Sequence, residues 1–427
     1  MNFLLAVVVS LPSSSSLVQD DESRRRAGDL IQRLDSDVIK ERERALEDLV
    51  ADFDRFEQAV KEAAEKGAPE VRARCQEILR QSAVARQRKD SWSPARPIRL
   101  SVKASPLREV VKQLGEASGY QIRLDPGSSD QPISINLDRM SFLEALGSLC
   151  RAAGLWYTRA RDGSFTLSPG KPPASSPSYV GPLVLSGTLS GLDKPQEIRR
   201  VALSINWEPR IKPRWFDVRV ESAEDDHGES VALNPDRSSG SDITHTWRFH
   251  NYPRQEAFAD PVMEVVPLAS PLKPGAKLRS LKGKITLYFP QEVSKLHIDV
   301  PPTGEKQQMG VVTASLDELR FERECWSSRF ELDTSRVPRE ERTALYAIFN
   351  MTPVRFIDRN GDAHPTEQKG GGSGGHVTDP LQRMSVWIYT VPLKSPLAAI
   401  EADIVTRVWE KTYSFELKDV GSSGDSK

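Results

Sequence analysis

Residues 97–169 switch between the repeat of a strand and the repeat of a helix, and this order restricts the fold more than any other feature of the sequence. Apolar residues at every second position predict strands over 98–102, 120–124 and 133–137. Apolar residues at helical spacing predict helices over 107–114 and 142–149. A final hairpin is expected around Asp162-Gly163. The order is therefore β-α-β-β-α-β, in which each helix can cover a face of a small sheet.

The ends of both predicted helices carry local signals. Gly119 and Gly154 follow the last apolar residues, where glycine favours termination of a helix. Ser141 and Glu144 have the spacing of a capping box, in which each side chain binds a backbone N–H of the first turn. We expect Ser141 to begin the second helix in this way.

The same region resembles the short N-terminal domain of secretins and TonB-dependent receptors. The resemblance covers about 70 of the 427 residues and rests on segments such as Ile98-Arg-Leu-Ser-Val, Ser118-Gly-Tyr-Gln-Ile and Met140-Ser-Phe-Leu-Glu-Ala-Leu. It implies a periplasmic module that contacts other proteins. A membrane barrel is not expected to follow, because the later strands lack lipid-facing alternation with aromatic girdles.

The N-terminal segment, 22–90, is rich in charge and has apolar residues at helical spacing. Gly67-Ala-Pro-Glu70 should separate two helices, since glycine ends a helix and proline can begin one. The segment resembles HEAT-type helical repeats, with room for only one or two units. Alternating acidic and basic residues favour a solvated helix surface over a nucleic-acid site.

A linker over 170–179 leads into a half of the chain with repeated short alternating runs, typical of antiparallel β-sandwiches. Residues 278–298 align without gaps on 397–417, and the turn beginning at Asp226 resembles the one beginning at Arg359. We therefore expect two related sandwiches, 180–304 and 305–421, followed by a disordered tail, 422–427. The expected fold class is multidomain α+β.

Residues 1–18 have the layout of a signal peptide, with an apolar run over 3–9 followed by small residues. No other stretch has the length and apolarity of a membrane-spanning helix, so no span is expected in the mature chain. The formal net charge of −1 provides no general attraction to nucleic acid. The three cysteines, Cys75, Cys150 and Cys325, are far apart in sequence and favour buried thiols over a disulfide framework.

Common catalytic motifs are absent from the sequence, so no catalytic, cofactor-binding or metal-binding residue is assigned. Two alternatives remain open. Asp358, Asp362 and His364, with the comparable group at 225–229, could bind a metal in a hydrolase, although hairpin turns explain the same residues. Tryptophans of the β-rich half could bind sugars if exposed, although core packing is favoured; they are Trp207, Trp215, Trp247, Trp326, Trp387 and Trp409.

A glycine-rich run at 370–375 is expected to be a flexible insertion, because it lacks the lysine and the helix of a phosphate-binding loop. Taken together, the organisation resembles exported planctomycete-type proteins to which no activity is assigned. We expect a non-catalytic protein of the periplasm or cell envelope that acts as an interaction module or scaffold for an envelope partner. No cofactor is expected, and a small-molecule ligand is left open.

Overall fold

The computed structural model describes residues 14–170, 177–190, 200–231, 262–268, 272, 277–300, 306–322, 325–350, 352, 354–368, 383–390 and 395–421. The chain divides into two compact units, residues 1–89 and 90–427. Helices and antiparallel sheets both contribute, which confirms the mixed α+β class. The apolar run over 3–9, the glycine-rich run and the 422–427 tail lie outside the described residues.

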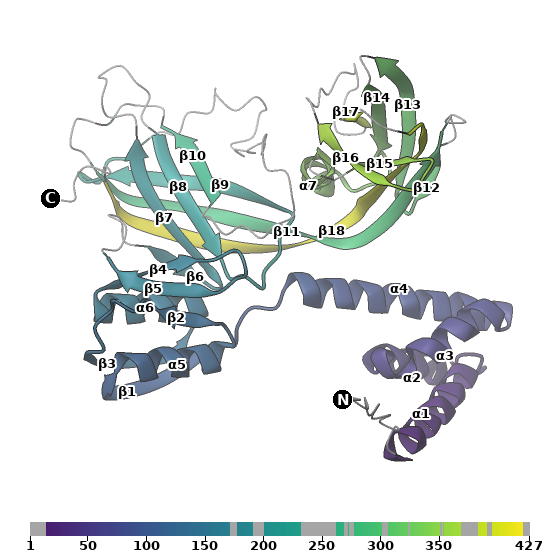
Figure 1. Cartoon of the computed structure of the whole chain (residues 1–427), viewed down its shortest axis with the longest axis horizontal. Coiled ribbons are helices and arrows are strands. Elements are labelled where there is room, and N and C mark those ends of the chain that lie inside the picture. Colours follow the sequence, from purple (N-terminus) through teal and green to yellow (C-terminus); the bar gives the residue numbers. More distant parts are fainter. Residues whose placement is uncertain are drawn as a thin grey trace, which may run out of the picture. The chain divides into compact units, whose positions relative to one another are not determined.

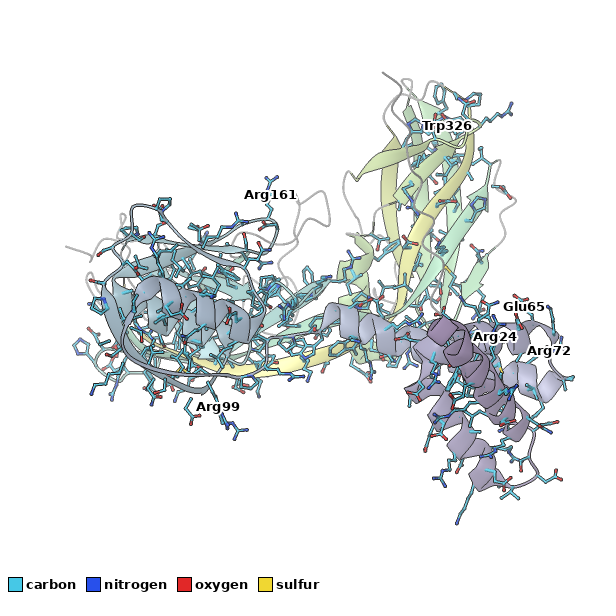
Figure 2. The ribbon with its side chains drawn as sticks, turned by 60° about the horizontal axis from the view of Figure 1, so that its bottom comes forward. Arg24, Glu65, Arg72, Arg99, Arg161 and Trp326 are labelled. Carbon is cyan, nitrogen blue, oxygen red and sulfur yellow. The ribbon has the colours of Figure 1, made fainter. Side chains whose placement is uncertain are left out.

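The first unit is helical (Figure 1). It holds α1 (Ser14–Arg33), α2 (Ile39–Ala51), α3 (Phe53–Lys66) and all but the last two residues of α4 (Pro69–Ser91). The predicted break is confirmed, because α3 ends at Lys66 and α4 begins at Pro69. A common core includes Leu49, Phe56 and Ile78, all fully buried. Arg24, Glu65 and Arg72 point outward from this unit (Figure 2), as expected of a solvated helix surface.

The second unit begins with the predicted order of strands and helices. Its elements are β1 (Ile98–Pro106), α5 (Leu107–Ser118), β2 (Ile122–Leu124), β3 (Pro132–Met140), α6 (Phe142–Ala153), β4 (Leu155–Arg159) and β5 (Phe165–Pro169). The strands form two sheets, β1-β3 and β2-β5-β4. Gly119 and Gly154 adopt the left-handed conformation just after the two helices, as their positions predicted. One core joins both helices to both sheets.

Strands dominate the remainder of this unit. They are β6 (Ser178–Val180), β7 (Leu183–Ser190), β8 (Arg200–Trp207), β9 (Trp215–Asp225), β10 (Val262–Pro267), β11 (Leu278–Asp299), β12 (Gln307–Met309), β13 (Val312–Glu322), β14 (Cys325–Asp333), β15 (Val354–Asp358), β16 (Ala363–Gln368), β17 (Arg383–Thr390) and β18 (Leu397–Val420), with helix α7 (Arg339–Asn350) between β14 and β15. One sheet has the order β10-β8-β7-β6, and a nine-stranded sheet has the order β12-β13-β14-β17-β16-β15-β18-β11-β9.

The long strands β11 and β18 pair with each other over almost their whole length (Figure 1). Two hydrophobic cores lie along this ribbon. One draws on β11 near Ile285 and on β18 near Phe415. The other draws on β11 at Leu296 and on β18 near Ile404. Each core therefore contains strand segments from both of the ranges expected as separate sandwiches.

The residues expected at matching positions, Ile285 and Ile404, are both fully buried, each in a different core. The strand order is also repeated, because β6-β7-β8-β10 in the first half corresponds to β12-β13-β14-β17 in the second. Part of the repeated Val-Pro-Leu segment cannot be compared, since 269–271 and 391–394 lie outside the described residues.

Candidate functional site

A groove of about 420 Å³ runs along the surface between α5 and β2. Its lining combines apolar side chains with charged ones, which is the composition of many peptide-binding surfaces. The lining residues are Arg108, Val111, Lys112, Gly115, Glu116, Tyr120, Ile122 and Leu124. No residue of this groove was singled out from the sequence as a functional residue.

Helix α5 forms one wall of the groove. Val110 and Leu114 face the core and are fully buried, whereas Lys112 and Glu116 lie on the opposite, exposed side. The helix ends at Gly119, whose φ of 71° suits glycine and lets the chain turn back toward β2. Strand β2 therefore runs back alongside the helix that precedes it.

Strand β2 forms the other wall and is an edge strand of its sheet. The N–H of Phe165 donates to the carbonyl of Gln121, and the N–H of Asp125 donates to the carbonyl of Leu167. Because successive residues of a strand direct their backbone groups to opposite sides, Ile122 and Leu124 direct theirs away from β5. Both side chains are half-buried. The groove thus offers an apolar floor beside a backbone edge that can accept another strand.

The inner end of the groove is anchored by Tyr120. Its hydroxyl donates to Glu208 Oε2 at 3.1 Å, and the backbone N–H of Ala95 donates to the same oxygen at 2.6 Å. The guanidinium of Arg210 lies 4.3 Å from the centre of the Tyr120 ring and donates to the carbonyl of Gly119. These contacts fix the groove to the end of β8.

Glu208 is 1% exposed, and this burial raises the pKa of its carboxyl group. Hydrogen bonds from Ala95 and Tyr120 oppose the rise, as does the backbone N–H of Phe142 at the start of α6. Sequence reasoning missed Glu208. A carboxylate after an alternating strand looks like an ordinary surface residue until its distant partners are known.

The expected capping box at the start of α6 is wrong. Ser141 makes no side-chain capping hydrogen bond, and its buried hydroxyl has no hydrogen-bond partner among the described residues. The carboxyl group of Glu208, from a distant part of the chain, lies against the N–H of Phe142 instead. A capping box would use the N–H groups of Ser141 and Glu144, whereas the tertiary contact from Glu208 reaches the N–H of Phe142, which lies between them.

The two aspartate turns considered as metal sites have matching hydrogen bonds. Asp225 Oδ1 accepts the N–H groups of His227 (2.9 Å) and Glu229 (2.8 Å). Asp358 Oδ1 accepts those of Asn360 (2.8 Å) and Asp362 (3.1 Å). An aspartate oxygen that accepts hydrogen bonds from backbone N–H groups two and four residues later stabilises a turn.

Asp358 has one further partner, since its Oδ2 lies 3.1 Å from His364 Nε2. Burial alone would raise the pKa of Asp358, but hydrogen bonds from His364, Asp362 and Asn360 together hold it below its ordinary value. Asp362 is exposed and contributes its backbone rather than its carboxylate. Within the described residues, no three His, Cys, Asp or Glu side chains are grouped as a metal ion would need.

The described tryptophans pack against other side chains. Trp207 and Trp215 are buried at 3% and 5% exposure, and Trp409 stacks on Phe289. Trp326 lies at the end of the β13–β14 pair (Figure 2), next to Phe321, which is 59% exposed. Trp247 and the side chain of Trp387 lie outside the described residues. Burial of Trp215 and packing of Trp409 argue against a sugar-binding platform at these two positions.

Two of the three cysteines can be placed, and both are buried free thiols. Burial raises the pKa of the Cys150 thiol to about 12 and also raises that of Cys75. Neither thiol is therefore activated for nucleophilic chemistry. The side chain of Cys325 lies outside the described residues.

No protein-family model matches the chain, and no curated protein shows significant similarity to it. Among the residues that the structure describes, no helix has both the length and the apolarity required to cross a membrane.

Proposed function

We propose that this protein is a non-catalytic, exported component of the cell envelope that binds extended segments of partner proteins in the α5–β2 groove. The observation that carries the proposal is the combination of half-buried Ile122 and Leu124 with a β2 edge that, among the described strands, has no partner on the side away from β5. A peptide added there gains main-chain hydrogen bonds from the edge and specificity from the side chains of the groove.

Residues 97–169 are proposed to be a secretin-type and TonB-receptor-type short N-terminal module. The β-rich half is proposed to consist of two related sandwiches, 180–304 and 305–421, that exchange strands through β11 and β18. The matching turns at Asp225 and Asp358 and the repeated strand order support this relationship. In this arrangement the sandwiches form the scaffold, and Glu208 and Arg210 hold the module against it.

A displayed library of random ten-residue peptides, selected against the purified chain, tests the binding function. Leu124→Pro is the matched variant, because it removes an N–H that points away from β5 and leaves the N–H groups that point toward β5. We expect selected peptides to bind this variant at least about tenfold more weakly. The side chain of Arg123 is exposed on the other face of the strand, so the Arg123→Ala variant should bind the selected peptides normally.

Thermal unfolding of both variants serves as the check of folding. Failure to select any peptide would overturn the proposal, as would undiminished binding to a folded Leu124→Pro variant. Export is tested separately by fractionation and N-terminal sequencing, which should place the mature start between Ser14 and Asp21. An intact Met1 on protein found in the cytoplasm would contradict export.

A further inference from the structure

The wall of the groove formed by α5 carries a regular order of charges. Arg108, Lys112 and Glu116 follow one another at intervals of four residues, so they lie one above another along the helix, about 6 Å apart. The two positive side chains are therefore at the start of the helix, and the negative one is near its end.

The direction of this order relative to β2 is set by the chain. The N–H of Arg108 donates to Asp130 Oδ1, in the loop that follows β2, so the positive end of the helix lies near Leu124. The negative end, at Glu116, lies near Tyr120, where the chain turns back from α5. Along the groove, the charges thus read positive, positive, negative from Leu124 toward Tyr120.

The three charges differ in how far they are already neutralised. Arg108 Nε lies 3.8 Å from Asp130 Oδ2, which offsets part of its charge. Lys112 and Glu116 are exposed, and neither has an ion-pair or hydrogen-bond partner among the described residues. Lys112 is therefore the cation most available to a ligand.

The spacing of these charges matches an extended peptide. Side chains on one face of a strand recur every two residues, or about 6.6 Å, close to the helical repeat of about 6 Å. Three alternate residues of a strand lying in the groove can therefore meet Arg108, Lys112 and Glu116 in turn. A helical ligand would not meet them while also using the β2 edge.

Resting on the peptide-binding function proposed above, we infer that the groove selects a partner strand with the pattern acidic-x-acidic-x-basic, bound antiparallel to β2. The two acidic residues face Arg108 and Lys112, and the basic residue faces Glu116. The antiparallel direction is chosen because antiparallel pairs have more direct hydrogen bonds and are the more common arrangement.

Fluorescence anisotropy with three labelled synthetic peptides tests the inference. Their cores are Glu-Val-Glu-Val-Lys, the charge-inverted Lys-Val-Lys-Val-Glu and the reversed Lys-Val-Glu-Val-Glu, each flanked by threonines. At low ionic strength, we expect the first to bind about three- to tenfold more tightly than either of the others, the range that several exposed ion pairs provide. Salt at about 1 M should remove most of this preference.

Lys112→Glu is the variant that isolates the charge effect. It should weaken binding of the first peptide and strengthen binding of the inverted one, so that the preference shrinks or reverses. Lys103→Glu makes the same change in charge at an exposed position of β1 outside the groove, and should leave the order of affinities unchanged.

The outcomes separate this inference from the function on which it rests. Equal affinities for the three peptides, all lost in Leu124→Pro, would leave peptide binding standing and overturn the charge pattern. A preference for the reversed peptide would overturn the antiparallel direction. An unchanged preference in Lys112→Glu would also overturn the inference. Failure of both these peptides and library peptides to bind would overturn the proposed function itself.

Discussion

Phe289 and Trp409 face each other across β11 and β18, and their rings stack with centroids 4.4 Å apart and planes at 19°. Trp92, from the segment that leads into β1, packs edge-on against both rings. Past this cluster, core-facing side chains on the ribbon belong to the second core instead of the first. The stacked pair therefore marks the place where the ribbon passes from one core to the other.

The pairing around this place is symmetric with respect to the alignment of residues 278–298 on residues 397–417. The alignment of Leu278 on Leu397, a shift of 119 positions, places Phe289 on Val408 and Pro290 on Trp409. In the pairing of β11 with β18, Phe289 lies opposite Trp409 and Pro290 lies opposite Val408. The two aligned segments are thus related by a local two-fold axis at this point. This is the relation expected if two copies of one sandwich exchange their long strands.

Complete burial makes Phe289 a position at which truncation should lower stability. Its side chain is fully buried, so Phe289→Ala should leave a cavity at the ribbon and lower the free energy of unfolding by about 3–5 kcal/mol. Phe321→Ala is the matched control, because Phe321 is largely exposed and its loss should cost less than about 0.5 kcal/mol. Urea unfolding followed by circular dichroism measures both. Equal effects of the two substitutions would contradict the assigned core.

Removal of Glu208 should destabilise the attachment of the module to β8. Glu208→Ala leaves the N–H of Ala95 and the hydroxyl of Tyr120 without their acceptor, at a cost of about 1–3 kcal/mol. Glu208→Gln keeps an acceptor oxygen and should cost much less. Hydrogen exchange of residues 97–169, read by mass spectrometry, should rise in the alanine variant. A rise of the same size in the glutamine variant would show that the hydrogen bonds do not matter.

The same carboxyl group gives a pH dependence whose sign follows from its burial. Because the pKa of Glu208 is raised in the folded state, the folded protein holds this proton more strongly than the unfolded chain. Its contribution to stability is present below the unfolded value and is lost as the pH rises through the folded value. Melting temperatures from pH 4 to 8 should therefore fall more for the wild type than for Glu208→Gln. Parallel curves would contradict this origin of the dependence.

Local sequence patterns were sufficient to predict most of the secondary structure of residues 97–169. The strand that begins at Ile98 follows from alternating apolar residues, and the helix that begins at Leu107 follows from apolar residues at helical spacing. The end of that helix follows from the backbone freedom of Gly119. Each feature could therefore be predicted from nearby residues. The pairing of β11 with β18 could not be predicted in this way. Alternation predicted that Ile285 and Ile404 face inward, but the choice of core depends on pairing across more than 100 residues.

The candidate site was hidden from the sequence for a similar reason. Lys112 and Glu116 look like ordinary exposed positions of an amphipathic helix, and Ile122 looks like a core residue of a short strand. They line one groove only because the fold brings α5 beside β2. The turn at Asp358 could be predicted from the sequence, because Asn-Gly between two strands indicates a hairpin whatever the tertiary fold.

The structure separates the effects expected of the two aspartates considered as metal ligands. Asp358 is 3% exposed and accepts hydrogen bonds from Asn360, Asp362 and His364, so Asp358→Ala should lower the melting temperature clearly. Asp362→Ala should change it little, because its carboxylate is exposed. Calorimetry with and without a chelator measures both effects. A stoichiometric metal in the purified protein, lost in either variant, would replace the turn interpretation with a metal site.

Asp217 provides a second test of how burial controls stability. One carboxylate oxygen, Oδ1, is buried and has no hydrogen-bond partner in the described part of the chain, and burial raises the pKa of the group to about 6. The raised pKa means that the folded state is favoured when Asp217 is protonated, and that stability is lost as the pH rises from about 4 through 6. Asp217→Asn removes this charge and should stabilise the protein above pH 7, by at most about 3 kcal/mol.

The control for this prediction is Asp138→Asn, at a side chain that is 77% exposed. It should change the free energy of unfolding by less than about 0.5 kcal/mol at any pH. Urea unfolding at pH 5 and pH 8 gives the comparison, and the gain from Asp217→Asn should be larger at pH 8. A gain of the same size at both pH values would show that the charge of Asp217 is not what destabilises the folded state.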